Sequence, residues 1–102
     1  MSDFGLPQRT IDEIHAIFAR HGKVEKVMVY GSRAMGNYST GSDIDLTMLG
    51  DGLKYEDMIR IAGELDDSSI PYLVDLSIFN QLNHAKLKDH IQRVGKVFYQ
   101  RK

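Results

Sequence analysis

Two aspartates, Asp43 and Asp45, stand one residue apart in a short segment in which they alternate with the apolar Ile44 and Leu46. This alternation predicts a β-strand, on which residues i and i+2 point to the same face, roughly 7 Å apart along the chain. Two carboxylates on one face repel each other unless something compensates, and a hard divalent cation would do so. The pattern therefore predicts a cation site, with an acidic surface strand as the alternative.

A Gly-Ser pair, Gly31 and Ser32, lies ahead of Asp43 with ten residues between. Glycine allows close backbone approach, serine adds a hydroxyl donor, and the start of a helix leaves N–H groups free for phosphate. Such a pair alone is most often a plain strand-to-helix turn with the serine as N-cap, and the lysine of a P-loop does not follow. Combined with the two aspartates, it predicts metal-assisted chemistry on a nucleotide phosphate.

A third carboxylate, Asp75, interrupts an apolar segment between Val74 and Leu76. A charge in such a segment needs a partner or a metal ion. If this segment forms a strand beside the one that carries the first two aspartates, Asp75 can act as a third metal ligand or as the base that accepts a hydroxyl proton. The alternative is a structural, hydrogen-bonding aspartate at the edge of a sheet.

The elements that must position these residues follow from hydrophobic periodicity and turn signals. We expect strands over residues 24–30, 43–49 and 72–78, a short helix after Ser32, and a loop over residues 37–42. The alternation of helices and strands predicts an α/β (α+β) fold, with a small mixed sheet of three strands or slightly more, flanked by helices.

Three longer helices are expected around this sheet. After a lead-in over residues 1–9, Thr10 is typical of an N-cap, and Glu13 completes a capping box. A second amphipathic helix is expected over residues 55–65. The last is expected over residues 87–98, with a break near Gly95; its apolar positions are Leu87, Ile91, Val94 and Phe98.

Length and composition limit the class of protein. The 102 residues suffice for one domain, 1–102, and 42% hydrophobic with 26% charged residues is typical of a globular chain. The net charge of −1 argues against direct nucleic-acid binding and against a membrane surface as partner. Without cysteine there is no disulfide or thiolate ligand. No apolar run reaches the ~20 residues of a membrane span, and no signal-peptide pattern opens the sequence, so we expect a cytoplasmic protein.

The remaining polar residues give weaker signals. Arg33 is a candidate contact for phosphate or for a partner, with a solvated surface cation as the alternative. The C-terminal stretch is basic, and a solvated helix face with a frayed tail is its plainer interpretation. The histidines show no metal-ligand spacing, so we expect surface or helix-end positions for them; they are His15, His21, His84 and His90.

These residues together resemble the signature of the polymerase-β-like nucleotidyltransferase superfamily. Gly31-Ser32, ten residues, and then Asp43-Ile44-Asp45 match its motif, and Asp75 falls where that superfamily has its third carboxylate. The stretch from Gly31 to Gly36, continuing to Leu46, is similar to the minimal nucleotidyltransferases, or MNT proteins. One residue departs from the usual Gly-Ser-Arg-Ala-Arg-Gly of MNT antitoxins, because Met35 replaces the second arginine.

The resemblance implies roles for these positions. Gly31 and Ser32, with Arg33 beside them, would hold the phosphates of ATP; Asp43 and Asp45 would bind two Mg²⁺ ions. Asp75 would complete the metal site and help to activate the acceptor hydroxyl. The reaction would transfer a nucleotidyl group and release pyrophosphate.

The resemblance also implies a partner. MNT proteins pair with all-helical HEPN proteins, so the expected function is that of an antitoxin that adenylylates a hydroxyl of a HEPN-type toxin within a hetero-oligomer. One alternative is a non-catalytic subunit that binds nucleotide or masks the toxin. Another is a nucleotidyltransferase that modifies a small molecule such as an aminoglycoside.

Overall fold

The computed structural model describes residues 4–102, which form four α-helices, one short 3-10 helix and four strands. The lead-in predicted over residues 1–9 lies partly outside the described residues, and its described part already contains the start of the first helix. In chain order the elements are α1 (Gln8–Ala19), β1 (Lys26–Tyr30), α2 (Ser32–Met35), β2 (Ile44–Leu49), α3 (Tyr55–Asp66), β3 (Val74–Ile78), η1 (Phe79–Gln81), α4 (Ala85–Val94) and β4 (Lys96–Gln100).

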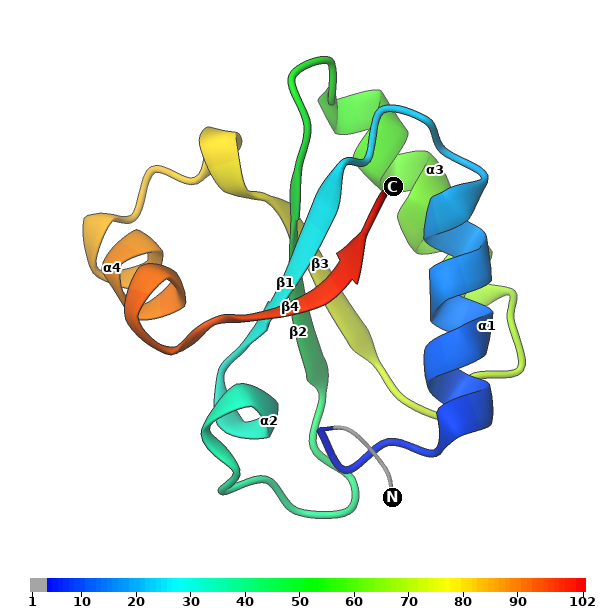
Figure 1. The fold of residues 1–102 in the computed structure, drawn as a ribbon, viewed down its shortest axis with the longest axis vertical. Helices are drawn as coiled ribbons and strands as arrows, with labels where there is room; N and C mark the ends of the chain where they lie inside the picture. The colour runs from blue at the N-terminus through cyan, green and yellow to red at the C-terminus, as the bar shows by residue number, and fades with distance from the viewer. Residues whose placement is uncertain (1–3) are drawn as a thin grey trace.

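The strands form one mixed sheet in the order β3-β2-β1-β4. β1 runs antiparallel to β2 and to β4, whereas β2 and β3 are parallel. A parallel pair needs a crossover connection, and α3 provides it. Figure 1 shows α1 and α3 on one side of the sheet and α4 on the other. The predicted α/β fold with a small mixed sheet flanked by helices is therefore confirmed, with one strand more than the three that we located.

The fourth strand lies where we expected the end of the last helix. The N–H of Gly95 donates to the Ile91 carbonyl at 2.8 Å, which ends α4, and a Cβ at Gly95 would overlap that carbonyl. The chain then pairs with β1, with Gln100 opposite Lys26. The prediction of a helix through Phe98 was wrong. This phenylalanine fits helical spacing, but it is buried from a strand position against α1. Its ring lies edge-on to the ring of His15, with the ring centres 5.0 Å apart.

The start of α1 also differs from the prediction. The N-cap is Pro7, whose carbonyl accepts the N–H of Thr10 at 3.0 Å, and Thr10 lies buried inside the first turn. Glu13 reaches across to Ser69 instead, accepting its N–H at 3.1 Å and its hydroxyl at 2.8 Å. The predicted capping box was wrong because proline, with its fixed φ, starts the helix earlier, and tertiary partners take the polar side chains.

The two faces of the sheet differ in chemistry. Alternate residues of β1 and β2 are fully buried against α1 and α3; among them are Val27, Val29, Leu46 and Met48. The opposite face is polar where β2 meets β3, and there the Ser77 hydroxyl lies 2.9 Å from the Thr47 hydroxyl. One face thus stabilises the fold, while the other is left with carboxylates and hydroxyls. Within the part of the chain that the structure describes, no helix has the length and apolarity to cross a membrane.

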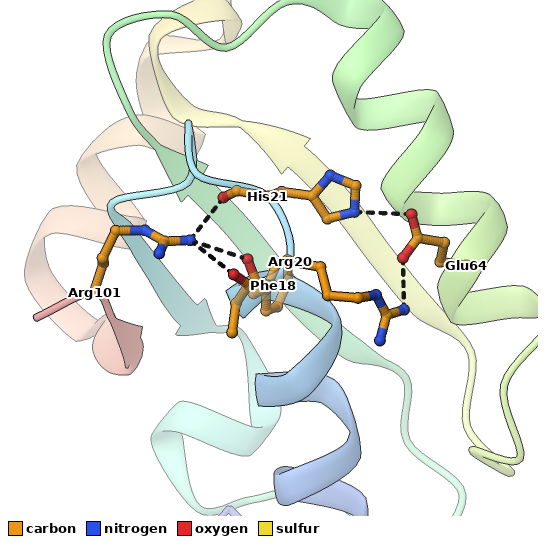
Figure 2. A network of polar contacts seen from close by, with 6 residues as sticks. Phe18, Arg20, His21, Glu64 and Arg101 are labelled. Carbon is orange, nitrogen blue, oxygen red and sulfur yellow. Dashed lines mark hydrogen bonds and ion pairs between the residues drawn. The ribbon is translucent and has the colours of Figure 1, made fainter.

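The C-terminus is tied to the end of α1 through one arginine, as Figure 2 shows. The Nη2 atom of Arg101 donates to the carbonyls of His21 at 2.9 Å, Ala19 at 3.3 Å and Phe18 at 3.4 Å, and its Nε donates to Val24 at 3.1 Å. The carbonyls of Phe18 and His21 also accept backbone N–H groups, whereas the guanidinium supplies the hydrogen bonds of the Ala19 and Val24 carbonyls. The frayed basic tail that we expected is therefore wrong for Arg101.

The same helix end is held to α3 by a carboxylate. Glu64 accepts from Arg20 at 2.7 Å and lies 2.8 Å from His21 Nε2, as the right-hand side of Figure 2 shows. The hydrogen bond from Arg20, followed by that from His21, lowers the pKa of Glu64. The loop after α1 is thus fixed to α3 and to the segment after β4.

Replacing Arg101 by methionine keeps the length of the side chain and removes its donors. Because the Ala19 and Val24 carbonyls then lose the hydrogen bonds that this side chain supplies, we expect Arg101→Met to lower the free energy of unfolding by about 1–3 kcal/mol. Urea denaturation followed by circular dichroism measures this change. The neighbouring exposed Lys102→Met should stay within about 0.5 kcal/mol of the parent. Equal stability of both variants and the parent would contradict the capping role of Arg101.

Candidate active site

The parallel pairing of β2 with β3 places Asp45 directly beside Asp75. Neighbouring strands are about 4.8 Å apart, so both side chains leave the polar face of the sheet close together. Asp43 immediately precedes β2 and lies two residues before Asp45, which puts it at the same end of this face. The condition set for Asp75, a strand adjacent to that of the other two aspartates, is therefore met.

The charges of its two neighbouring carboxylates add to the cost of ionising Asp45. The pKa of Asp45 lies above its ordinary value, first because the group is partly buried, and then because of the charges of Asp75 and Asp43; His90 acts in the opposite direction. Among residues 4–102, none of the ion pairs involves any of these three aspartates. The repulsion is thus left largely uncompensated by the protein.

A divalent cation fits this donor set by its chemistry. All three groups offer carboxylate oxygen, the ligand that Mg²⁺ prefers, and a bound cation would relieve the repulsion that raises the pKa of Asp45. Within residues 4–102 the structure does not bring three His, Cys, Asp or Glu side chains close enough to form a coordination sphere by themselves. Asp43, Asp45 and Asp75 therefore remain proposed ligands.

The Gly31-Ser32 turn lies against this acidic group. Tyr30, at the end of β1, pairs with Asp45, and Gly31 follows with φ of +72°. A Cβ at Gly31 would overlap the Asp45 carboxylate, so only glycine allows this approach in this conformation. Ser32 then opens α2. The predicted phosphate-binding turn and the predicted metal ligands are thus in contact.

Arg33 has a different environment from the one that we expected. Its side chain is only 2% exposed, so the solvated surface cation is wrong. It donates to the carbonyls of Ser42 at 2.8 Å and Phe4 at 2.9 Å, and its guanidinium carbon lies 5.2 Å from the ring centre of Tyr38 and 5.1 Å from that of Tyr72. Arg33 therefore holds the loop that leads into Asp43, which is a positioning role.

Two further residues of the site escaped sequence analysis. His90 of α4 accepts the Gly31 N–H through Nε2 at 3.3 Å, and its ring lies edge-on to Tyr30. We had expected a surface or helix-end position for it. Burial raises the pKa of Tyr30; the charges of Asp75 and Asp45 add to this, and a hydrogen bond with Ser77 opposes it. Only the packing of α4 on the sheet brings His90 here, so the local sequence holds no signal for it.

Comparison with known proteins identifies the class. The family described as "Polymerase beta, Nucleotidyltransferase" matches residues 12–102 of this chain. A search of curated protein sequences finds no match. The chain thus belongs to the polymerase beta family of nucleotidyltransferases, which confirms the superfamily and the enzyme class that the motif predicts.

Several solved structures have the same fold as this chain. A toxin–antitoxin structure with AMP-PNP superposes with a TM-score of 0.71 at 22% identity, covering 95% of this chain and 76% of the other. The MntA–HepT toxin–antitoxin gives 0.68 at 21%, covering 93% and 74%. A tri-AMPylated HEPN toxin of Shewanella oneidensis with its MNT antitoxin gives 0.67 at 21%, covering 92% and 72%. At these identities the likeness establishes the fold alone.

The raised pKa of Asp45 predicts a stabilising substitution. Because the folded state holds this proton more tightly than the unfolded state, ionisation of Asp45 at neutral pH disfavours folding, and stability rises as the pH falls through its folded-state pKa. In metal-free buffer at pH 7 we expect Asp45→Asn to raise Tm by a few degrees, and the difference from the parent to shrink on acidification. Differential scanning calorimetry from pH 7 to pH 4 measures both effects. A less stable variant at pH 7 would contradict the repulsion.

Proposed function

We propose that this chain is a Mg²⁺-dependent nucleotidyltransferase that moves AMP from ATP to a hydroxyl of a partner protein. The observation that carries the proposal is the register of β2 and β3, which sets Asp45 beside Asp75 with the Gly31 turn against them. Three carboxylates next to a turn of this kind match the needs of a phosphoryl displacement with two metal ions. The family match supports the same class of reaction.

Each residue has a distinct role in the proposed reaction. Asp43 and Asp45 would hold two Mg²⁺ ions, which when bound supply the positive charge that the triphosphate needs. Ser32 would orient the terminal phosphates, and Gly31, which has no side chain, would let them approach the turn closely. Asp75, which is exposed, would accept the proton of the acceptor hydroxyl. The hydroxyl oxygen forms a bond to the α-phosphorus, the bond between that phosphorus and the β-phosphate oxygen breaks, and pyrophosphate leaves.

The position of Asp75 supports a large acceptor. It lies on β3, an edge strand of the sheet, and Leu73, two residues earlier in the chain, is 71% exposed. An exposed apolar side chain beside a reactive carboxylate favours a protein partner that covers both. The aspartates are therefore reachable from outside by a hydroxyl that another chain carries.

A HEPN-type toxin is the partner that we propose. The similar structures are complexes of toxin and antitoxin, one with AMP-PNP and one whose HEPN toxin carries AMP groups. The proposed assembly is a hetero-oligomer with a helical HEPN protein, which we expect a neighbouring gene to encode. ATP would be the donor, and the proposed location is the cytoplasm, as the sequence predicts. Arg33 would support the proposed reaction by holding the loop before Asp43 in place.

The test is the mass of the partner after incubation with this chain, ATP and Mg²⁺. We expect a gain of one or more AMP units with the parent chain, a loss of at least about 100-fold in rate with Asp43→Asn or Asp45→Asn, and a smaller loss with Asp75→Asn. Asp66→Asn, an exposed carboxylate at the end of α3, is the matched control and should keep the parent rate.

The outcomes separate the candidate functions. Full transfer by both Asp43→Asn and Asp45→Asn would rule out the proposed site. A tight complex that never gains AMP, and that forms equally with these variants, would identify a masking subunit instead. Transfer to an aminoglycoside without any protein acceptor would identify a small-molecule enzyme.

A further inference from the structure

Helix α4 packs on the polar face of the sheet and on η1, and its first turn is capped by a side chain. Ile91 is only 2% exposed and lies over the sheet beside Met28. The ammonium group of Lys88 lies 5.0 Å from the centre of the Phe79 ring. At its start, the Nδ1 atom of His84 accepts the Leu87 N–H at 3.1 Å and caps the helix. The side chains that α4 directs toward the site are therefore held in place, and His90 is one of them.

His90 holds the Gly31 amide from outside the turn. Its Nε2 accepts the Gly31 N–H at 3.3 Å, while its ring lies edge-on to Tyr30, with the ring centres 6.2 Å apart and the planes at 80°. To accept a hydrogen bond, Nε2 must carry its lone pair, which puts the proton on Nδ1. Both residues that His90 contacts lie at the junction of β1 with the phosphate-binding turn.

Gly31 is the residue of this turn whose backbone has the most conformational freedom, so a hydrogen bond that fixes it has the largest effect there. Its φ of +72° and its missing Cβ leave the peptide free to rotate in ways that other residues exclude. Its carbonyl already accepts the Met35 N–H at 3.1 Å, which fixes the side of the turn toward α2. The N–H on the other side is fixed by His90 alone among the contacts within residues 4–102. His90 and α2 thus fix the orientation of Gly31 from both ends.

The turn also sets the position of a carboxylate. A Cβ at Gly31 would overlap Asp45, so rotation of the Gly31 peptide moves the backbone that contacts this side chain. By holding Gly31, His90 therefore affects both parts of the proposed site, the phosphate-binding turn and the carboxylate of Asp45.

We propose that His90 is a positioning residue for the nucleotide: its Nε2 atom holds the Gly31 amide so that the Gly31-Ser32 turn keeps the shape that receives the phosphates of ATP. This role rests on the proposed nucleotidyl transfer. It assigns to α4, outside the Gly-Ser and Asp-x-Asp motifs, a part of the nucleotide site. It also explains why a polar side chain of α4 faces the end of β1, where the neighbouring Ile91 is apolar.

The test compares two substitutions that differ in one property. Glutamine places an acceptor oxygen near the position of Nε2, whereas leucine has similar bulk and no acceptor. We expect His90→Leu to raise KM for ATP about ten-fold, as the loss of one well-placed hydrogen bond would, with a smaller effect on kcat. His90→Gln should stay within about three-fold of the parent. Both variants should unfold at temperatures close to the parent, because half-buried His90 contributes little to the core.

Two further measurements make the comparison specific. Binding of α,β-methylene-ATP, in which the bond that breaks during transfer is replaced, reports the nucleotide site by calorimetry without any reaction. His84→Asn is the matched control, since asparagine is also a good N-cap and keeps α4 intact. We expect parental binding for His84→Asn and His90→Gln, and about ten-fold weaker binding for His90→Leu.

The results separate this inference from the proposed function. Parental binding and KM in His90→Leu, an equal defect in His90→Gln, or tighter binding in His90→Leu would each overturn the role of His90; the last would show that His90 occupies the place of a phosphate. If the parent chain binds the analogue but never modifies the partner, the proposed function fails. In that case, binding of the analogue by His90→Leu and His90→Gln still decides the role of His90.

Discussion

The repulsion among three carboxylates on one face of the sheet is the constraint on which the site depends. Parallel pairing of β2 and β3 forces Asp45 and Asp75 together, and Asp43 adds its charge at the end of β2. Like charges at neighbouring positions destabilise a sheet, so the arrangement needs support elsewhere. A bound divalent cation would turn this repulsion into affinity. The feature that weakens the folded chain is therefore the one that we expect to bind the metal.

The support comes from the other face of the sheet and from two arginines. The apolar side of β1 and β2 is fully buried under α1 and α3, and this burial is the main stabilising term. Arg101 satisfies the carbonyls at the end of α1. Arg33, buried among the carbonyls of Phe4 and Ser42, fixes the loop before Asp43. Arg33 is buried and Arg101 is partly buried, so neither is the solvated surface cation that the sequence alone suggested as an alternative.

Local spacing made much of the site predictable. Asp43 and Asp45 follow from strand alternation, and the Gly31-Ser32 turn follows from its residue types, because both signals lie within a few neighbouring residues. The prediction for Asp75 depended on one condition, which was that its strand pairs with β2, and the structure meets this condition. The family match confirms the class of protein that the motif predicts, while the roles of these residues stay predictions.

The rest depended on partners that are distant in the sequence. The pairing of β4 with β1, the burial of Arg33 and the approach of His90 to Gly31 each join segments that no periodic pattern connects. The N-cap at Pro7 differs from the prediction because Thr10 and Glu13 fit a capping box, whereas the helix begins at the proline three residues before Thr10. Fold class and carboxylates were thus accessible from the sequence, whereas the residues that position them were not.

The most direct measurement of this account is an NMR titration of the Asp45 carboxyl carbon, with and without Mg²⁺. Without metal we expect the pKa of Asp45 to lie above the ordinary aspartate value, because of burial and of the charges of Asp75 and Asp43. With Mg²⁺ the same pKa should fall below the ordinary value, since the cation favours the ionised form. An ordinary pKa that does not respond to Mg²⁺ would contradict the central claim that these carboxylates form a cation site.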